Sequence, residues 1–150
     1  MHTARSRRQR EHGFSLIELL IVVAIISVIA SIAIPNYIES QHSACAASAI
    51  ESLRRIHSGQ ISYRAANNRF TDLGTLGAGH YVEDEYVVAG AKSRYRFALT
   101  VDAADPDADY KATATPSLTP GTWRHFYVDG SGVIHSSLGS PASASSPPLN

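Results

Sequence analysis

Residues 13–34 read Gly-Phe-Ser-Leu-Ile-Glu-Leu-Leu-Ile-Val-Val-Ala-Ile-Ile-Ser-Val-Ile-Ala-Ser-Ile-Ala-Ile, and the only ionisable side chain in this run is that of Glu18. A helix needs about 20 consecutive apolar residues to cross the hydrocarbon core of a bilayer. The run from Phe14 to Ile34 has that length. It therefore predicts a helix that anchors the chain in a membrane.

Glu18 is the unusual residue of this run. A carboxylate inside a spanning helix costs roughly 2.5–3.5 kcal/mol, so it usually has a partner and a function. Beyond Gly13, the first lysine or arginine is Arg54, far outside the run. If the chain is cut between Gly13 and Phe14, a new α-ammonium group forms four residues from Glu18, in the same copy or in a neighbouring one. We therefore predict cleavage at this bond and self-association of the product.

A basic leader precedes the run, with arginines at positions 5, 7, 8 and 10. Positive charge next to a membrane helix favours the cytoplasmic side, which places the bulk of the chain on the other side. The alternative interpretation is a plain single-pass anchor in which Glu18 reaches the membrane interface. Both interpretations predict the same topology.

The leader ending in Gly13, the Phe-Ser-Leu-Ile-Glu segment and the Ile34-Pro35-Asn36-Tyr37 segment together resemble the N-terminal signature of type IV pilins and type II secretion pseudopilins. An ordinary signal peptide has a shorter apolar stretch and is cut after it. Here the predicted cut would precede the apolar stretch, so this stretch would stay in the mature protein. The resemblance covers residues 13–37 closely and the following helix more loosely.

This resemblance implies several properties. Gly13 is the last leader residue, recognised by a prepilin peptidase, and Phe14 becomes an N-methylated mature terminus. Glu18 assists methylation and subunit docking. The implied partners are further copies of the chain, an inner-membrane assembly platform and an external ATPase, since the sequence has no nucleotide-binding motif. The implied fold is α+β, a long N-terminal helix packed on a small antiparallel sheet.

Composition agrees with an exported protein of modest size. The 150 residues suffice for one domain beyond the anchor. The formal net charge is zero, but removing residues 1–13 leaves nine basic and twelve acidic side chains, about −3, which gives no global attraction to nucleic acid. Cys45 is the only cysteine, so no intrachain disulfide can form, in contrast to many pilins.

The helical pattern continues to about Ala66. Apolar or small residues recur every three or four positions and predict a face that packs on a sheet. Pro35 lies inside the helix and predicts a kink or flexible joint between anchor and head, because it lacks an N–H group. The predicted face consists of Ala46, Ala49, Ile50, Leu53, Ile56, Gln60 and Tyr63.

After this helix the apolar side chains recur at every second position, which is typical of strands. Residues 67–85 read as irregular, and the glycines in Asp129-Gly130-Ser131-Gly132 predict a turn. Predicted strands are Tyr86–Val88, Tyr95–Val101, Tyr110–Ala114, His125–Val128 and a return at Val133–His135. The sequence thus divides into a leader (1–13), an anchor helix (14–35), its amphipathic continuation (36–66), a β-rich head (67–136) and a disordered Ser/Pro/Ala-rich tail (137–150).

An acidic loop is the one candidate for a metal. Asp105, Asp107 and Asp109 alternate as in a calcium loop, but Tyr110 stands where an EF-hand needs Gly and Pro116 where it needs Glu. A solvated acidic hairpin is the favoured interpretation, and weak calcium binding the alternative. We expect no cofactor.

The remaining candidates favour structural roles over catalysis. His57 lies on the helix face and is expected at the edge of the core, and Cys45 stands among small helix residues. Alternation places Arg94 and Arg96 on the solvent face of a strand, so a DNA-binding patch is not favoured.

We therefore expect a filament subunit rather than an enzyme, anchored in the inner membrane and then part of a type IV pilus. The alternatives are a pseudopilin of a type II secretion system, in a periplasmic pseudopilus, and a membrane-anchored module that binds DNA or a surface ligand.

Overall fold

A computed structural model describes residues 13–102, 105–117 and 123–149, without the side chains of residues 85 and 86. The chain forms two compact units, residues 1–39 and 40–150. Most of the predicted leader lies outside the described residues. In the second unit a long helix packs against a small antiparallel sheet, which confirms the predicted α+β, pilin-like class.

The first unit contains the N-terminal part of helix α1, which spans Leu16–Asn67 and is assigned without a break across Pro35. Its side chains are exposed, apart from the half-buried Ala30. This part of α1 is long and apolar enough to cross a membrane by length and composition, and none of its most apolar window is buried. The flexible joint at Pro35 stays a prediction.

Within the second unit, α1 buries one face. The predicted positions Ala49, Leu53 and Ile56 are fully buried, and spacings of three and four residues keep them on one side. The helix ends at Asn67, and Asn68 adopts a left-handed conformation with φ 56° that closes the last turn through its N–H to the Arg64 carbonyl. The complete buried set is Ala49, Ser52, Leu53, Ile56, Gly59, Gln60 and Tyr63.

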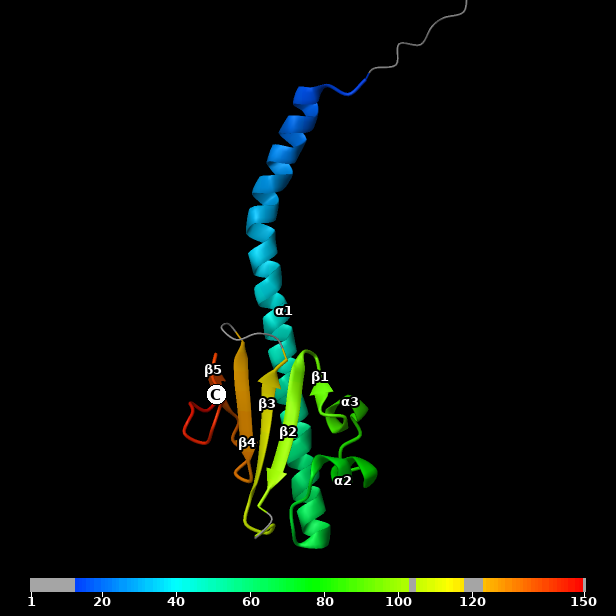
Figure 1. Ribbon diagram of the computed structural model, residues 1–150, viewed down its shortest axis with the longest axis vertical. Coiled ribbons are helices and arrows are strands. Elements are labelled where there is room, and N and C mark those ends of the chain that lie inside the picture. Colours follow the sequence, from blue (N-terminus) through cyan, green and yellow to red (C-terminus); the bar gives the residue numbers. More distant parts are fainter. Residues whose placement is uncertain (1–12, 103–104, 118–122, 150) are drawn as a thin grey trace, which may run out of the picture. The chain divides into compact units, whose positions relative to one another are not determined.

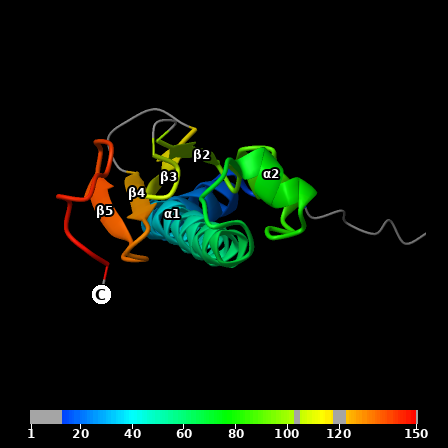
Figure 2. The ribbon, with the colours of Figure 1, turned by 90° about the horizontal axis from the view of Figure 1, so that it is seen from below.

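Five antiparallel strands follow in simple sequence order along the sheet (Figure 1). Seen from below, β3, β4 and β5 lie beside α1, and α2 lies on another flank of the helix (Figure 2). The strands are β1 (Ala91–Lys92), β2 (Tyr95–Val101), β3 (Tyr110–Pro116), β4 (Arg124–Asp129) and β5 (His135–Leu138).

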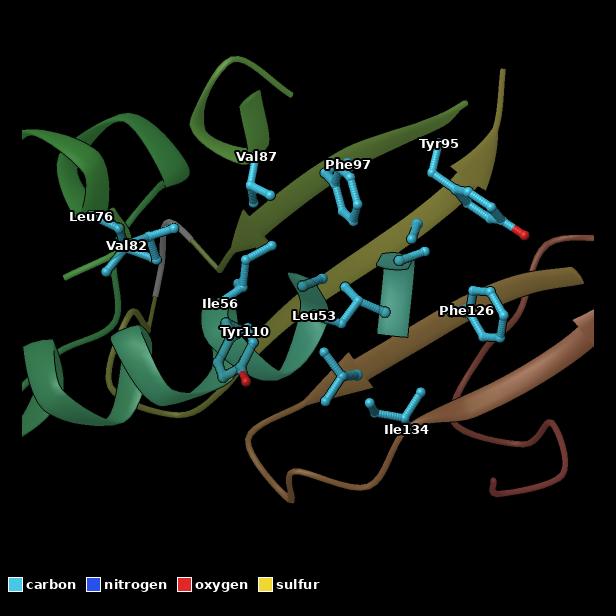
Figure 3. Close-up of a cluster of buried hydrophobic side chains, with 14 of the residues drawn as sticks. Leu53, Ile56, Leu76, Val82, Val87, Tyr95, Phe97, Tyr110, Phe126 and Ile134 are labelled. Atoms are coloured by element: carbon cyan, nitrogen blue, oxygen red, sulfur yellow. The ribbon is translucent and has the colours of Figure 1, made fainter. Parts of the chain in front are cut away.

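Alternation along the strands builds the core between sheet and helix. Tyr95 and Phe97 of β2 are buried, whereas the intervening Arg96 is exposed. Figure 3 shows these rings, with Phe126 of β4, gathered around Leu53 of α1. The predicted strand Tyr95–Val101 is confirmed at both ends, and the strands predicted at 110–114 and 125–128 are confirmed with slightly wider bounds.

Two predictions for residues 67–88 were wrong. A short helix, α2 (Leu73–Ala78), interrupts the segment predicted as irregular, and Tyr86–Val88 belongs to a helical turn, α3 (Glu85–Val88), rather than a strand. Caps explain both differences. Asp72 accepts a hydrogen bond from Thr75 N at 3.0 Å, and Asp84 accepts one from Val87 N at 3.3 Å. A short apolar run fits either structure, so such local bonds decide the outcome.

The C-terminal region also differs from the prediction. The returning strand runs from His135 to Leu138 instead of Val133–His135, and the residues after it are ordered rather than a disordered tail. Pro147 O accepts a hydrogen bond from Ser136 N at 2.9 Å, and Leu149 N donates to Ile134 O at 2.8 Å. The edge of β5 and the residue before it thus provide hydrogen-bond partners for the C-terminal residues, which the composition of those residues does not indicate. Proline suits this place, because an outermost edge needs no N–H on its solvent side.

Candidate functional site

The start of α1 presents an accessible peptide bond. Gly13 and Phe14 precede the helix, which begins at Leu16. A Cβ atom built on Gly13 would meet no atom within 4 Å, and the Phe14 side chain is 75% exposed. The bond between Gly13 and Phe14 is therefore open to a protease, as the predicted cleavage requires.

Glu18 lies in the first turn of α1, where a negative charge complements the unpaired N–H groups of the helix end. Its side chain is exposed and forms no ion pair with any residue that the structure describes. Gly13, Phe14 and Glu18 are thus gathered at one end of the helix. Pro35 lies 17 residues further along α1, about 25 Å away at the helical rise, and belongs to no common cluster with them.

Two serines inside the apolar span have satisfied hydroxyl groups. Ser27 Oγ donates to Val23 O, and Ser31 Oγ donates to Val28 O, each at 2.7 Å. Such bonds let a hydroxyl group enter lipid or a helix bundle without an unmet donor. A serine within a long apolar run is a sequence signal for this bond, and both serines were missed among the predicted functional residues.

The rest of the span is a continuous exposed apolar surface. Leu16, Val28, Ile29 and Ile32 are each more than 60% exposed, and most of their apolar neighbours are more than half exposed. A surface of this size needs a lipid or protein partner.

The N-terminal segment matches a known protein family. Residues 8–34 match the family model described as the prokaryotic N-terminal methylation motif. The chain carries this methylation motif. The match includes Gly13, Phe14 and Glu18, the residues that the structure gathers at the start of α1.

Three curated relatives match the chain over stretches longer than the methylation motif. The chain is 43% identical over 64 residues to the type IV major pilin protein PilA of Myxococcus xanthus, covering 43% of this chain and 29% of that protein. It is 31% identical over 61 residues to the type II secretion system core protein G of Pectobacterium carotovorum, covering 41% and 39%. A second core protein G, from Aeromonas hydrophila, is 27% identical over 64 residues. The matches span less than half of the length of each relative, and they support a pilin or pseudopilin subunit.

The acidic loop contains Asp105, Asp107 and Asp109, the weak calcium candidates of the sequence. No three His, Cys, Asp or Glu side chains lie close enough to hold a metal within residues 13–102, 105–117 and 123–149. Asp109 Oδ1 instead accepts hydrogen bonds from Tyr110 N and Gly130 N, both at 2.8 Å. Asp109 therefore ties the start of β3 to the turn after β4, and Asp105 and Asp107 do not join it in a cluster.

That turn also contains Asp129. Burial alone would raise the pKa of its carboxyl group. Hydrogen bonds from the Ser131 hydroxyl and amide groups outweigh this effect, so that the pKa lies below its ordinary value. The carboxylates of Asp109 and Asp129 therefore both accept hydrogen bonds that hold the turn in place.

His57 joins the helix to the sheet. Its Nδ1 atom lies 2.6 Å from Tyr110 Oη, and its ring is half-buried beside Gly132. Burial raises the pKa of Tyr110, so its hydroxyl group stays neutral and can donate to the imidazole. This arrangement is the core-edge role predicted for His57.

One arginine lies elsewhere than predicted. Arg96 is on the exposed face of β2, but Arg94 precedes the strand, in a two-residue hairpin turn with Ser93. Their φ angles of 49° and 66° are those of a type I′ turn, which usually contains Asn or Gly. Because Ser93 and Arg94 are unusual in such a turn, the sequence does not predict it.

Proposed function

We propose that this protein is a structural subunit of a type IV pilus-like filament, cut between Gly13 and Phe14 by a prepilin peptidase. The observation that carries the proposal is the arrangement at the start of α1. An exposed Gly-Phe bond precedes a helix with a carboxylate in its first turn and an uncovered apolar surface behind it. The methylation motif over the same residues supports N-methylation of Phe14.

The subunit first resides in the inner membrane. The apolar part of α1 spans the bilayer, the arginine-rich leader stays in the cytoplasm, and the head lies on the other side. An assembly platform in that membrane and an ATPase would drive extraction of the subunit. The protein itself is not an enzyme in this proposal.

Assembly depends on pairing and packing rather than on the hydrophobic effect. Moving α1 from lipid into a helix bundle exchanges one apolar environment for another and gains little hydrophobic free energy. The α-ammonium group of Phe14 in one copy and the Glu18 carboxylate in another would neutralise each other inside the bundle. Without the carboxylate, the ammonium group would be buried unpaired, at a cost of roughly 3–5 kcal/mol.

A pseudopilin of a type II secretion system is the second candidate. The similarity to two core G proteins favours it specifically. Surface filaments that disappear with the gene would support the pilin, whereas loss of protein export without surface filaments would support the pseudopilin. A membrane-anchored binding module would instead stay monomeric with its leader uncut.

Intact-mass analysis of membrane-extracted protein tests the processing step. The proposal expects loss of residues 1–13, with or without one added methyl group. A Gly13→Lys variant should keep its leader, because a peptidase site that accepts glycine has no room for the longer side chain. A mature terminus after the apolar run would contradict the proposal.

A further inference from the structure

Helix α1 begins at a defined residue, just after the bond that the proposed peptidase cuts. Gly13, Phe14 and Ser15 lie outside the helix, and Leu16 is its first residue. Leu19 N donates a hydrogen bond to Ser15 O at 3.2 Å. A residue that lies outside the helix while its carbonyl group accepts the first helical bond is the N-cap. Ser15 therefore occupies the N-cap position of α1.

The sequence around Ser15 suits this position. Serine is among the best N-cap residues, because its side-chain oxygen can accept a hydrogen bond from an N–H group of the first turn, whereas alanine is among the poorest. Residues 15–18 read Ser-Leu-Ile-Glu, which is the Ser-x-x-Glu pattern of helix starts, and Phe14 and Leu19 are apolar at the two positions that flank such a start. The Ser15 side chain is exposed and is bound to no other described residue, so nothing competes with the helix for its hydroxyl group.

The leader would otherwise favour a longer helix. Residues 7–11 read Arg-Arg-Gln-Arg-Glu, and each of these residue types is a good helix former. Gly13 opposes a helix through its low propensity, but one glycine alone does not end a helix reliably. Ser15 supplies the second stop signal, two residues further along the chain.

An earlier helix start would engage the bond between Gly13 and Phe14. In a helix the carbonyl group of one residue accepts from the N–H group four residues later, so Gly13 O would accept from Ile17 N. Hydrolysis adds a water across the peptide bond: the hydroxyl goes to the carbonyl carbon of Gly13, and the Phe14 nitrogen leaves as an amine and gains a proton. A peptidase must reach both atoms. The cleavage rate therefore depends on the population of chains in which this bond is open.

We propose that Ser15 is a positioning residue for leader removal. By capping α1 it keeps the Gly13–Phe14 bond outside the helix, where the peptidase can bind it. The inference rests on the proposed function, which supplies both the peptidase and the bond. The cleavage rate should then follow the N-cap preference of residue 15 rather than its size or its hydroxyl group.

Substitutions of Ser15 in the full-length chain test the proposal. Asparagine is larger than serine and has no hydroxyl group, but it caps equally well, so Ser15→Asn should be cut at the parent rate. Alanine is small but caps poorly. Ser15→Ala should be cut about two- to thirtyfold more slowly, which is an N-cap preference of about 0.5–2 kcal/mol expressed as a population ratio. Intact mass, followed over time in detergent-solubilised membranes that contain the prepilin peptidase, measures both rates.

Two further measurements separate positioning from direct recognition by the peptidase. A smaller population of the open bond raises KM by the same factor and leaves kcat unchanged, since the bond is open in every bound substrate. The second measurement uses uncut chains from cells that lack the peptidase. The NMR chemical shift of the Phe14 Cα atom should move toward its helical value in Ser15→Ala and stay at the parent value in Ser15→Asn.

Cleavage of Ser15→Ala at the parent rate would overturn the proposal. Equal slowing of Ser15→Asn and Ser15→Ala would also overturn it, and would show that the peptidase binds the hydroxyl group. Slow cleavage of Ser15→Ala with an unmoved Phe14 shift would refute it as well. If the unchanged chain keeps its leader or is cut at another bond, the proposed function fails. In a chain that is cut between Gly13 and Phe14, the other outcomes refute the role of Ser15 alone.

Discussion

The side chain of Gln60 and the backbone of Thr71 hydrogen-bond to each other in both directions. Gln60 Nε2 donates to Thr71 O, and Gln60 Oε1 accepts from Thr71 N at 3.1 Å. Gln60 is fully buried on α1, and Thr71 lies just before α2. One buried amide therefore fixes the chain where it turns back from the helix toward the sheet.

Replacing Gln60 by Leu should destabilise the head by about 1–3 kcal/mol, because both backbone groups of Thr71 lose their partner while the volume of the side chain is kept. Urea unfolding of a fragment covering residues 41–150 measures the change. Ser58→Ala, on the exposed side of the same helix, is the control and should alter stability by less than about 0.5 kcal/mol. An equally small effect of Gln60→Leu would show that water replaces the amide.

The Asp72 cap of α2 should make stability depend on acid. Hydrogen bonds from Thr75 hold the pKa of the Asp72 carboxyl below its ordinary value of 3.8. A lowered folded-state pKa means that the stabilisation is present above the unfolded-state value and is lost as the pH falls through the folded-state pKa. Asp72→Ala should therefore cost about 0.5–2 kcal/mol near pH 7, and this cost should shrink below about pH 4. A cost independent of pH would contradict the charged cap.

The ordered C-terminal segment should protect the edge of β5. Ending the chain after Gly139 removes the backbone bonds from Pro147 and Leu149 and uncovers the strand. We expect a lower melting temperature and concentration-dependent aggregation of the head fragment, because an open strand edge pairs with other chains. Ending the chain after Leu149 is the control. A truncated fragment that melts like the parent would restore the prediction of a disordered tail.

Redox conditions should not affect the head. Cys45 is the only cysteine and lies half-buried on α1, so the fold depends on packing. The melting temperature of the 41–150 fragment should be the same with and without reducing agent. A marked drop on reduction would reveal a Cys45 bridge between two copies.

The sequence predicts the parts of the fold that depend on periodicity. The three- and four-residue spacing of Ala49, Leu53 and Ile56 locates the buried helix face, and alternation from Tyr95 to Val101 locates β2. Both patterns extend over enough residues to exclude the other type of structure.

What the sequence does not predict depends on single contacts rather than on a repeated pattern. The caps at Asp72 and Asp84 turn apolar pairs into helical turns, and the edge of β5 orders residues whose composition is typical of disorder. The positive φ angle of Arg94 belongs to a turn that its residue type does not indicate. Gly13, Phe14 and Glu18 are predicted from the sequence because their roles depend on order along the chain.

The role of Glu18 in assembly is the central claim, and a Glu18→Val subunit tests it most directly. Removing the carboxylate should improve membrane insertion, by less than the roughly 2.5–3.5 kcal/mol that a charge costs at the centre of a spanning helix, because Glu18 lies in the first turn of α1. The variant should therefore accumulate in the inner membrane with a folded head. Electron microscopy of cells that produce only this variant should show few or no filaments, because the Phe14 ammonium group of each incoming subunit meets no carboxylate. Filaments of normal number and length built from Glu18→Val subunits alone would contradict the account.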